Sequence, residues 1–184
     1  MLPVMFTGKT PEKRRTLGAN TLRDGFYRPR HNGSFMPDND PHSALLLDNQ
    51  LCFALYSTSL MMTKAYKPLL KSLNLTYPQY LAMLVLWEED GITVSHISKR
   101  LLTDPGSLTP LLKRLESDGL LNRRRRKDDE RVVELHLTEQ GLALQTQAKD
   151  IPDCIVDVSG QSVAGLMELK QRLVEMRSNL KTPT

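Results

Sequence analysis

The two cysteines are the residues of this sequence that could carry out chemistry of their own. Cys52 and Cys154 are the only thiols among its 184 residues. A thiolate attacks a peroxide to give a sulfenic acid, which can then condense with a second thiol. If Asp48 is the N-cap of a helix, Cys52 lies in the first turn, where the helix dipole favours the thiolate. The alternative is that both cysteines are buried, inert thiols in a reducing cytoplasm.

The sequence shows the pattern of neither a metal site nor a membrane-spanning segment. Two cysteines and four histidines show no spacing of a zinc site, and we expect neither a metal nor a cofactor. No stretch reaches the roughly 18 apolar residues of a membrane span. The N-terminus lacks the apolar segment of a secretion signal. We therefore expect a cytoplasmic protein without a membrane partner.

Positive charge gathers in two segments. The formal net charge is only +4, but residues 1–43 carry seven basic and four acidic side chains, and residues 113–131 carry eight and five. Two basic segments in a near-neutral protein favour a polyanionic partner, nucleic acid before membrane. Residues 1–43 also break every period with glycine and proline, which predicts a disordered extension. This extension binds DNA non-specifically, or it is an over-long start or a cloning remnant.

Apolar spacing predicts the helices that position these residues. From Leu45 the apolar residues recur with a helical period until Pro68, which kinks or ends the helix. Thr76 and Gln79 predict a capping box for a second helix, which stops at Gly91.

Two short helices joined by a tight turn follow. Thr93 caps the first, Val94–Leu101, and a turn over residues 103–106 leads to the second, residues 107–117. This pattern predicts a helix-turn-helix, whose second helix enters the major groove of DNA. The polar face of that helix, where base edges would be read, consists of Ser107, Thr109, Lys113 and Arg114.

After Gly119 the period changes to two. Residues 120–126 and 131–137 flank the charged turn 127–130, which predicts a β-hairpin. The expected fold class is mainly α with a small β-hairpin wing, a winged helix-turn-helix over residues 93–137. Arginine suits a narrow minor groove, so the hairpin adds three expected DNA contacts, Arg123, Arg125 and Arg131. The alternative is a helix-turn-helix that contacts protein, with an arginine run that is merely solvated or serves as a localisation signal.

Two further helices complete the pattern. Thr138 caps one that Pro152 interrupts, and an amphipathic helix follows over about residues 162–180. The apolar stripes of residues 44–73 and 138–180 exceed what one small winged helix can cover, so we expect dimerisation helices there. A two-fold homodimer places its recognition helices roughly 34 Å apart, which requires a pseudo-palindromic operator in double-stranded DNA.

Four segments carry a resemblance to a known family: residues 108–116 (LTPLLKRLE), 119–120 (GL), 129–131 (DER) and 137–141 (LTEQG). They resemble the MarR family of winged-helix repressors, over about residues 45–180. The resemblance implies that Arg131 enters the minor groove and that Asp129 orients it.

Three other segments narrow the resemblance: residues 48–57, 66–70 and 75–81. They are similar to the organic-hydroperoxide-sensing (OhrR-type) repressors of that family. This implies that Cys52 is the peroxide-reactive residue and that Tyr66 and Tyr77 of the partner subunit hydrogen-bond to it. It makes Cys154 the candidate resolving thiol, about one helical turn earlier than in two-cysteine members. A low-molecular-weight thiol such as glutathione is the alternative reaction partner of oxidised Cys52.

Together these patterns predict a redox-responsive transcriptional repressor that leaves its operator when an organic hydroperoxide oxidises Cys52. Two alternatives stay open: a MarR-like repressor relieved by a small aromatic ligand, and a thiol peroxidase. A peroxidase needs a residue that activates the leaving oxygen, usually an arginine beside the cysteine, and no arginine lies near Cys52 in the sequence. We therefore do not expect an enzyme.

Overall fold

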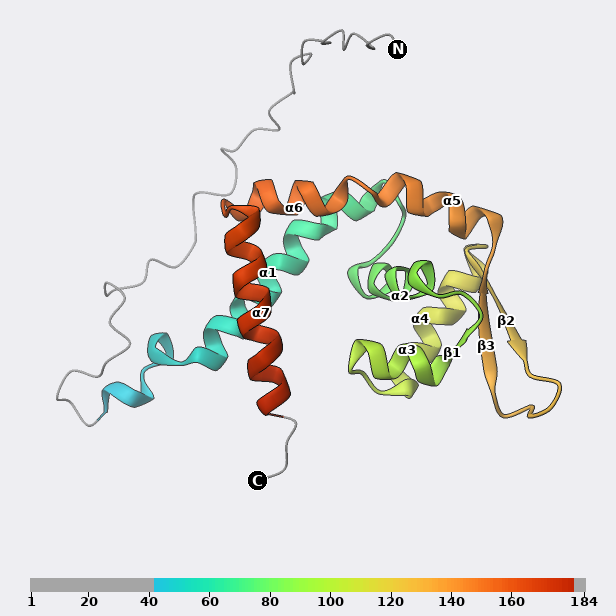
Figure 1. Ribbon diagram of the computed structural model, residues 1–184, viewed down its shortest axis with the longest axis horizontal. Helices are drawn as coiled ribbons and strands as arrows, with labels where there is room; N and C mark the ends of the chain where they lie inside the picture. The colour runs from blue at the N-terminus through green and yellow to red at the C-terminus, as the bar shows by residue number, and fades with distance from the viewer. Residues whose placement is uncertain (1–41, 181–184) are drawn as a thin grey trace, which may run out of the picture. The chain divides into compact units, whose positions relative to one another are not determined.

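The computed structural model of this protein describes residues 42–180 (Figure 1). Its backbone contacts divide the chain into two units, Met1–Ala54 and Leu55–Thr184. The disordered extension predicted for residues 1–43 lies, apart from its last two residues, outside the described residues.

The first unit contains two short 3-10 helices and the start of a long α-helix: η1 (Ser43–Leu45), η2 (Leu47–Asn49) and α1 (Leu51–Lys71). The predicted N-cap, Asp48, lies inside η2, so this prediction is wrong. The 3-10 turn takes up Asp48, and Gln50 accepts the first helical hydrogen bond from the N–H of Ala54 at 3.1 Å. Gln50, with extended backbone angles, is therefore the residue from which α1 starts.

Of the two outcomes predicted at Pro68, a kink or the end of the helix, the second is wrong: α1 does not end there. It continues to Lys71, although proline removes one backbone N–H from the helix. The last turn is retained because Leu69 packs against the core and Leu70 is fully buried in it. Tertiary packing here outweighs the loss of one helical hydrogen bond.

Helix α2 (Tyr77–Glu88) begins as predicted. Oε1 of Gln79 accepts a hydrogen bond of 2.8 Å from the backbone N–H of Thr76, which is part of the predicted capping box. The helix ends at Glu88, and the chain turns at Gly91, whose φ of +72° is suited to glycine.

The predicted helix-turn-helix is formed by α3 (Val94–Leu101) and α4 (Pro105–Ser117). Thr93 caps α3, as predicted. Helix α4 begins two residues earlier than expected, because Asp104 rather than a later residue is its N-cap. Pro105 fits the first helical position, where its missing N–H would have no partner within the helix.

Three antiparallel strands form one sheet in the order β1–β3–β2: β1 (Ile92–Thr93), β2 (Leu121–Arg125) and β3 (Val133–Leu137). Strands β2 and β3 are the predicted hairpin, joined by the loop that Figure 1 shows at its end. In the hairpin Arg123 lies opposite Leu135. The sequence does not predict β1, since two residues show no period, yet Ile92 pairs with Leu135 from the other side.

Three helices follow the sheet: α5 (Glu139–Ala148), α6 (Ile151–Ser159) and α7 (Val163–Asn179). The side chain of Thr138 caps α5, as predicted. The side chain of Ser162, near which the last helix is expected to begin, caps α7. Helix α6 is not predicted by the sequence, in which Pro152 indicates only the interruption of the preceding helix. Pro152 lies in the first turn of α6, where a backbone N–H needs no helical partner, so this proline begins a helix.

The core of the second unit lies where α2 meets α3, α4, α5 and β3. Its largest fully buried side chains are Leu70, Met83, Leu86, Ile97, Leu112, Leu115, Leu121 and Leu135. Gly141 allows α5 to approach the start of the hairpin closely, since a Cβ there would lie 2.0 Å from the carbonyl oxygen of Leu120. Within residues 42–180, no helix combines the length and apolarity that a membrane crossing needs.

Candidate functional site

Helix α4 presents the polar face that the sequence predicts. Ser107, Lys113 and Arg114 are exposed and Thr109 is half-buried. On the opposite side Leu108, Leu112 and Leu115 are buried. Because the apolar side is held in the core, the polar side is directed to solvent. All four predicted residues therefore share an accessible helix face.

Local contacts order this face. The hydroxyl of Ser107 donates to the carbonyl oxygen of Asp104 at 2.7 Å, and that of Thr109 donates to the carbonyl oxygen of Pro105 at 3.3 Å. Nε of Arg114 lies 3.1 Å from Oδ2 of Asp118, in a pair whose arginine is 66% exposed. Such a pair contributes little to stability, and the guanidinium can exchange its partner for a phosphate.

At the hairpin loop, Asp129 contacts Arg131 through the backbone. Oδ1 of Asp129 accepts a hydrogen bond of 3.0 Å from the backbone N–H of Arg131, and both residues are exposed. The carbonyl oxygen of Asp129 also accepts from the N–H of Val132 at 3.0 Å. Asp129 therefore shapes the turn from which the side chain of Arg131 projects.

The same loop contains an ion pair that the sequence does not predict. Nη2 of Arg126 lies 2.6 Å from Oδ2 of Asp128, and its Nε lies 3.5 Å from Oε1 of Glu134. The hydrogen bond to Asp128 raises the pKa of Arg126 and lowers the pKa of that carboxyl group. Because these groups are exposed, added salt screens the pair.

The two arginines predicted as DNA contacts on β2 differ in accessibility. Arg125 is exposed, whereas the side chain of Arg123 is only 22% exposed. The backbone N–H of Arg123 donates to Oε1 of Glu116 at 3.0 Å, and its Nη1 lies 3.8 Å from Oε2 of the same carboxylate. Glu116, near the end of α4, is not among the predicted site residues, although it lies in the segment of family resemblance.

Cys52 lies in the first turn of α1, as predicted, and it is exposed. The first backbone N–H groups of a helix lack helical partners and carry the positive end of its dipole. An exposed thiol at this position is accessible to a small oxidant. In the single chain Cys52 therefore differs from the buried thiol of the alternative interpretation.

Tyr66 of α1 and Tyr77 of α2 lie together in the second unit. Their ring centroids are 4.7 Å apart, and Tyr80 lies 5.9 Å from Tyr66. Burial, followed by the nearby Tyr77 and Tyr80, raises the pKa of Tyr66 to about 12, and burial also raises the pKa of Tyr77. Both phenols stay protonated at neutral pH and can donate hydrogen bonds to an anion.

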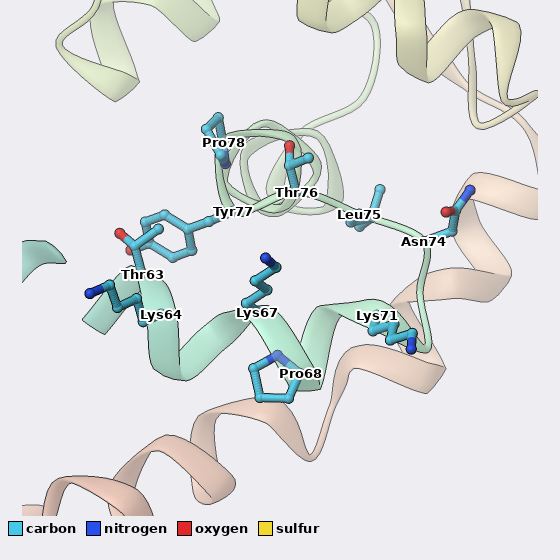
Figure 2. A pocket seen from close by; sticks show the side chains of 10 residues that line it. All are labelled: Thr63, Lys64, Lys67, Pro68, Lys71, Asn74, Leu75, Thr76, Tyr77 and Pro78. Atoms are coloured by element: carbon cyan, nitrogen blue, oxygen red, sulfur yellow. The ribbon is translucent and has the colours of Figure 1, made fainter. Parts of the chain in front are cut away.

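A cavity of about 770 Å³ opens beside Tyr77, between α1 and α2. The residues that line it are Thr63, Lys64, Lys67, Pro68, Lys71, Asn74, Leu75, Thr76, Tyr77 and Pro78. Figure 2 shows the side chain of Lys67 pointing from α1 toward α2, with Lys64 and Lys71 to either side. The sequence does not predict this cavity, because the cavity depends on how two helices pack.

Cys154 is half-buried in α6, and its backbone N–H donates to the carbonyl oxygen of Asp150 at 3.2 Å. It lies on a helix rather than in the interruption that the sequence predicts. Among residues 42–180, no group of three or more His, Cys, Asp or Glu side chains could hold a metal ion.

Comparison with known proteins places this geometry in a family. Residues 64–147 match the family model described as transcriptional regulator SarA/Rot. The organic hydroperoxide resistance transcriptional regulator of Bacillus subtilis (strain 168) is 51% identical over 134 residues, which are 73% of this chain and 91% of that protein.

Solved structures of AbfR, a Staphylococcus epidermidis protein, are also similar. Reduced AbfR bound to DNA has 36% identity and a TM-score of 0.66, covering 73% of this chain and 92% of that one. Disulfide-formed AbfR has 34% identity and a TM-score of 0.52, covering 73% and 90%. With its winged helix-turn-helix and its match to the Bacillus regulator over most of both lengths, this chain belongs to the organic hydroperoxide resistance regulators of the MarR family of winged-helix transcription factors.

Proposed function

We propose that this protein is a redox-responsive repressor that leaves its operator when an organic hydroperoxide oxidises Cys52. The observation that carries the proposal is the exposed thiol in the first turn of α1, in a chain 51% identical to a hydroperoxide resistance regulator. AbfR, at 34 to 36% identity, has been solved both reduced on DNA and as a disulfide, which supports cysteine oxidation as the input. A repressor of this kind acts on DNA in the cytoplasm.

DNA binding is assigned to α4 and the hairpin. The exposed face of α4 offers Ser107, Thr109, Lys113 and Arg114 to base edges and phosphates. The hairpin loop directs Arg131 outward from a turn held by Asp129. This division, a helix in the major groove and an arginine in the minor groove, fits the geometry of a winged helix.

The active form in this proposal is a homodimer. Helix α7 has no buried residue in the single chain, and its apolar side chains Val163, Met167 and Val174 are 59%, 66% and 43% exposed. On α1, Leu60 and Met61 are 44% and 38% exposed. Apolar faces of this extent favour a second copy as their cover. In the dimer, Tyr66 and Tyr77 of one subunit would donate hydrogen bonds to the Cys52 thiolate of the other.

The peroxide itself is the two-electron oxidant of the redox step. The thiolate sulfur of Cys52 attacks one peroxide oxygen, the O–O bond breaks, and the alkoxide leaves and takes up a proton to become an alcohol. Sulfur is oxidised to a sulfenic acid. A second thiol, Cys154 or a low-molecular-weight thiol such as glutathione, then forms a disulfide with release of water.

One experiment tests the proposal directly. A duplex selected by the reduced protein from random DNA is titrated before and after treatment with cumene hydroperoxide, for wild type, Cys52→Ser and Cys154→Ser. We expect the wild type to release the duplex and Cys52→Ser to hold it. Release from Cys52→Ser, or retention by oxidised wild type whose Cys52 is shown by mass spectrometry to be modified, would sink the redox proposal.

The cavity between α1 and α2 favours a second candidate, relief by a small aromatic ligand. It is mostly apolar and lies beside Tyr77. Under this candidate an aromatic carboxylate releases the duplex from Cys52→Ser as well as from wild type, with no change in the mass of either protein. A catalytic role is distinguished by steady-state consumption of peroxide with a recycling reductant, and we expect only a single turnover.

A further inference from the structure

Arg123 and Arg124 are adjacent in sequence but occupy different surroundings. Arg124 is exposed on β2, opposite Glu134 of β3. Arg123 lies opposite the fully buried Leu135, and its side chain is 22% exposed. Since strand residues alternate between faces, the two guanidinium groups leave the strand on opposite sides.

The inward arginine meets the end of the recognition helix. The backbone N–H of Arg123 donates to Oε1 of Glu116 at 3.0 Å, while Nη1 lies 3.8 Å from Oε2. Both oxygens of one carboxylate on α4 therefore face one residue of β2. Nε of Arg123 is buried and has no hydrogen-bond partner among residues 42–180, so this part of the side chain is out of water while the rest is 22% exposed.

Glu116 also accepts a hydrogen bond through its backbone. Its carbonyl oxygen is 3.0 Å from the N–H of Gly119, in the turn where the chain leaves α4. Leu120 N–H donates to the carbonyl oxygen of Leu115 at 3.0 Å in the same turn. Glu116 thus bonds the turn with its main chain and the strand beyond it with its side chain. These contacts join the end of α4 to the first strand of the hairpin.

We propose that Arg123 is a positioning residue, which with Glu116 holds the wing at a set angle to α4, and that Arg124 makes the phosphate contact on β2. This inference rests on the proposed DNA binding and revises the role predicted for Arg123. Arg123 with Glu116 fixes where Arg131 and the face of α4 stand relative to each other. Arg124 supplies charge.

The test compares Arg123→Gln with Arg124→Gln, the same charge change on opposite faces of one strand. Affinity for a duplex selected by the wild type is measured against salt concentration. We expect Arg124→Gln to reduce the salt slope by about one. Arg123→Gln is expected to keep the slope, weaken the selected duplex about tenfold, and leave binding to a mixed-sequence duplex unchanged. A lower slope for Arg123→Gln, or an unchanged slope for Arg124→Gln, overturns the proposal.

Glu116 provides a test with opposite signs. Removing a negative charge near DNA strengthens binding by electrostatics alone. If the carboxylate positions the wing, Glu116→Ala weakens binding to the selected duplex instead, and Glu116→Gln, which keeps an oxygen for the Arg123 N–H, restores part of it. The double variant of Glu116→Gln and Arg123→Gln is then no weaker than the weaker single variant. Tighter binding by Glu116→Ala contradicts the proposal.

Hydrogen exchange measured without DNA tests this inference separately from the proposed function. The backbone amide of Arg123 is expected to exchange its hydrogen slowly in the free wild-type protein and in Glu116→Gln, and faster in Glu116→Ala. Equal exchange rates in all three proteins would contradict the proposed contact between Glu116 of α4 and Arg123 of β2. Failure of the wild type to select any duplex counts against DNA binding, while the exchange rates still judge the contact itself.

Discussion

The indole Nε1 of Trp87 donates a hydrogen bond of 2.9 Å to the carbonyl oxygen of Gly141. This contact joins α2 to the first turn of α5. Tyr80 packs edge-on against Trp87 with centroids 6.2 Å apart, and Tyr66 packs against Tyr80. A series of ring contacts therefore leads from the tyrosines proposed to hold the Cys52 anion to the helix that begins where the wing ends.

Trp87→Phe tests the value of this contact. The variant keeps an aromatic ring but leaves the carbonyl oxygen of Gly141 without the indole donor, so the free energy of unfolding should fall by about 1 to 3 kcal/mol. Urea unfolding followed by circular dichroism measures it, since the variant has no tryptophan. Tyr56→Phe changes an exposed aromatic residue and should leave the midpoint unchanged. Equal midpoints for Trp87→Phe and wild type would show that the bond contributes nothing.

Gly141→Ala tests the close approach of α5 to the hairpin. Its new Cβ would lie 2.0 Å from the backbone oxygen of Leu120, which no side-chain rotation can relieve. We expect a loss of about 3 kcal/mol or more. Gly165→Ala is the matched control, because Gly165 also lies in the first turn of a helix beside its N-cap, but its new Cβ would meet side-chain oxygens of Ser162 at 3.3 Å and Gln161 at 3.8 Å and no backbone atom. A thermal midpoint equally shifted in both variants would contradict the packing argument.

Arg131→Ala tests the wing. Loss of one cation near the DNA should weaken duplex binding and lower the salt slope by about one. Arg172→Ala on α7 is the control, since Arg172 is equally charged, exposed and paired with Glu168. A slope unchanged in Arg131→Ala, or reduced to the same extent in Arg172→Ala, would remove the assigned role of the wing arginine.

The tyrosine pair predicts a loss of stability in alkali. Tyr66 has its pKa raised from 10.0 to about 12 in the folded protein, chiefly by burial. Tyr66 therefore holds its proton more tightly in the folded state than in the unfolded state. The stability that this difference contributes is complete below pH 10 and is lost as pH rises through about 12. Ultraviolet titration of tyrosinate should lose its highest-titrating component in Tyr66→Phe, and retain it in Tyr56→Phe. Loss of this component in Tyr56→Phe, with its retention in Tyr66→Phe, would refute the argument that burial raises the pKa of Tyr66.

Cys154→Ser decides which thiol completes the oxidation. If Cys154 resolves, treatment with cumene hydroperoxide links two wild-type subunits by a disulfide, and Cys154→Ser shows none on a non-reducing gel. Mass spectrometry of Cys154→Ser with glutathione present should then find a mixed disulfide at Cys52. A covalent dimer that persists in Cys154→Ser would exclude Cys154 as the resolving residue.

Local signals predict the elements whose ends depend on a few neighbouring residues. Thr93 and Thr138 cap their helices as the sequence predicts, because a cap is an interaction over three residues. The hairpin is equally legible, since its period of two places Leu135 in the core. The predicted N-cap at Asp48 is wrong because neighbouring residues place Asp48 in a 3-10 turn that precedes the helix.

Features that depend on distant contacts escape prediction. Strand β1 exists because Ile92 finds Leu135, far along the chain. The cavity beside Tyr77 and the contact of Arg123 with Glu116 arise from packing between elements. Within the run of four arginines, alternation predicts that Arg123 and Arg124 differ in face, but only the buried Leu135 shows which of them points inward.

Trp87 is the only tryptophan of the sequence, and it bridges α2 and α5. The molecule therefore contains its own optical reporter at the contact that joins the tyrosine cluster to the end of the wing. A change that draws α5 away from α2 alters the polarity and hydrogen bonding of a single indole. Its natural emission can follow duplex binding and peroxide addition in real time, with no label attached.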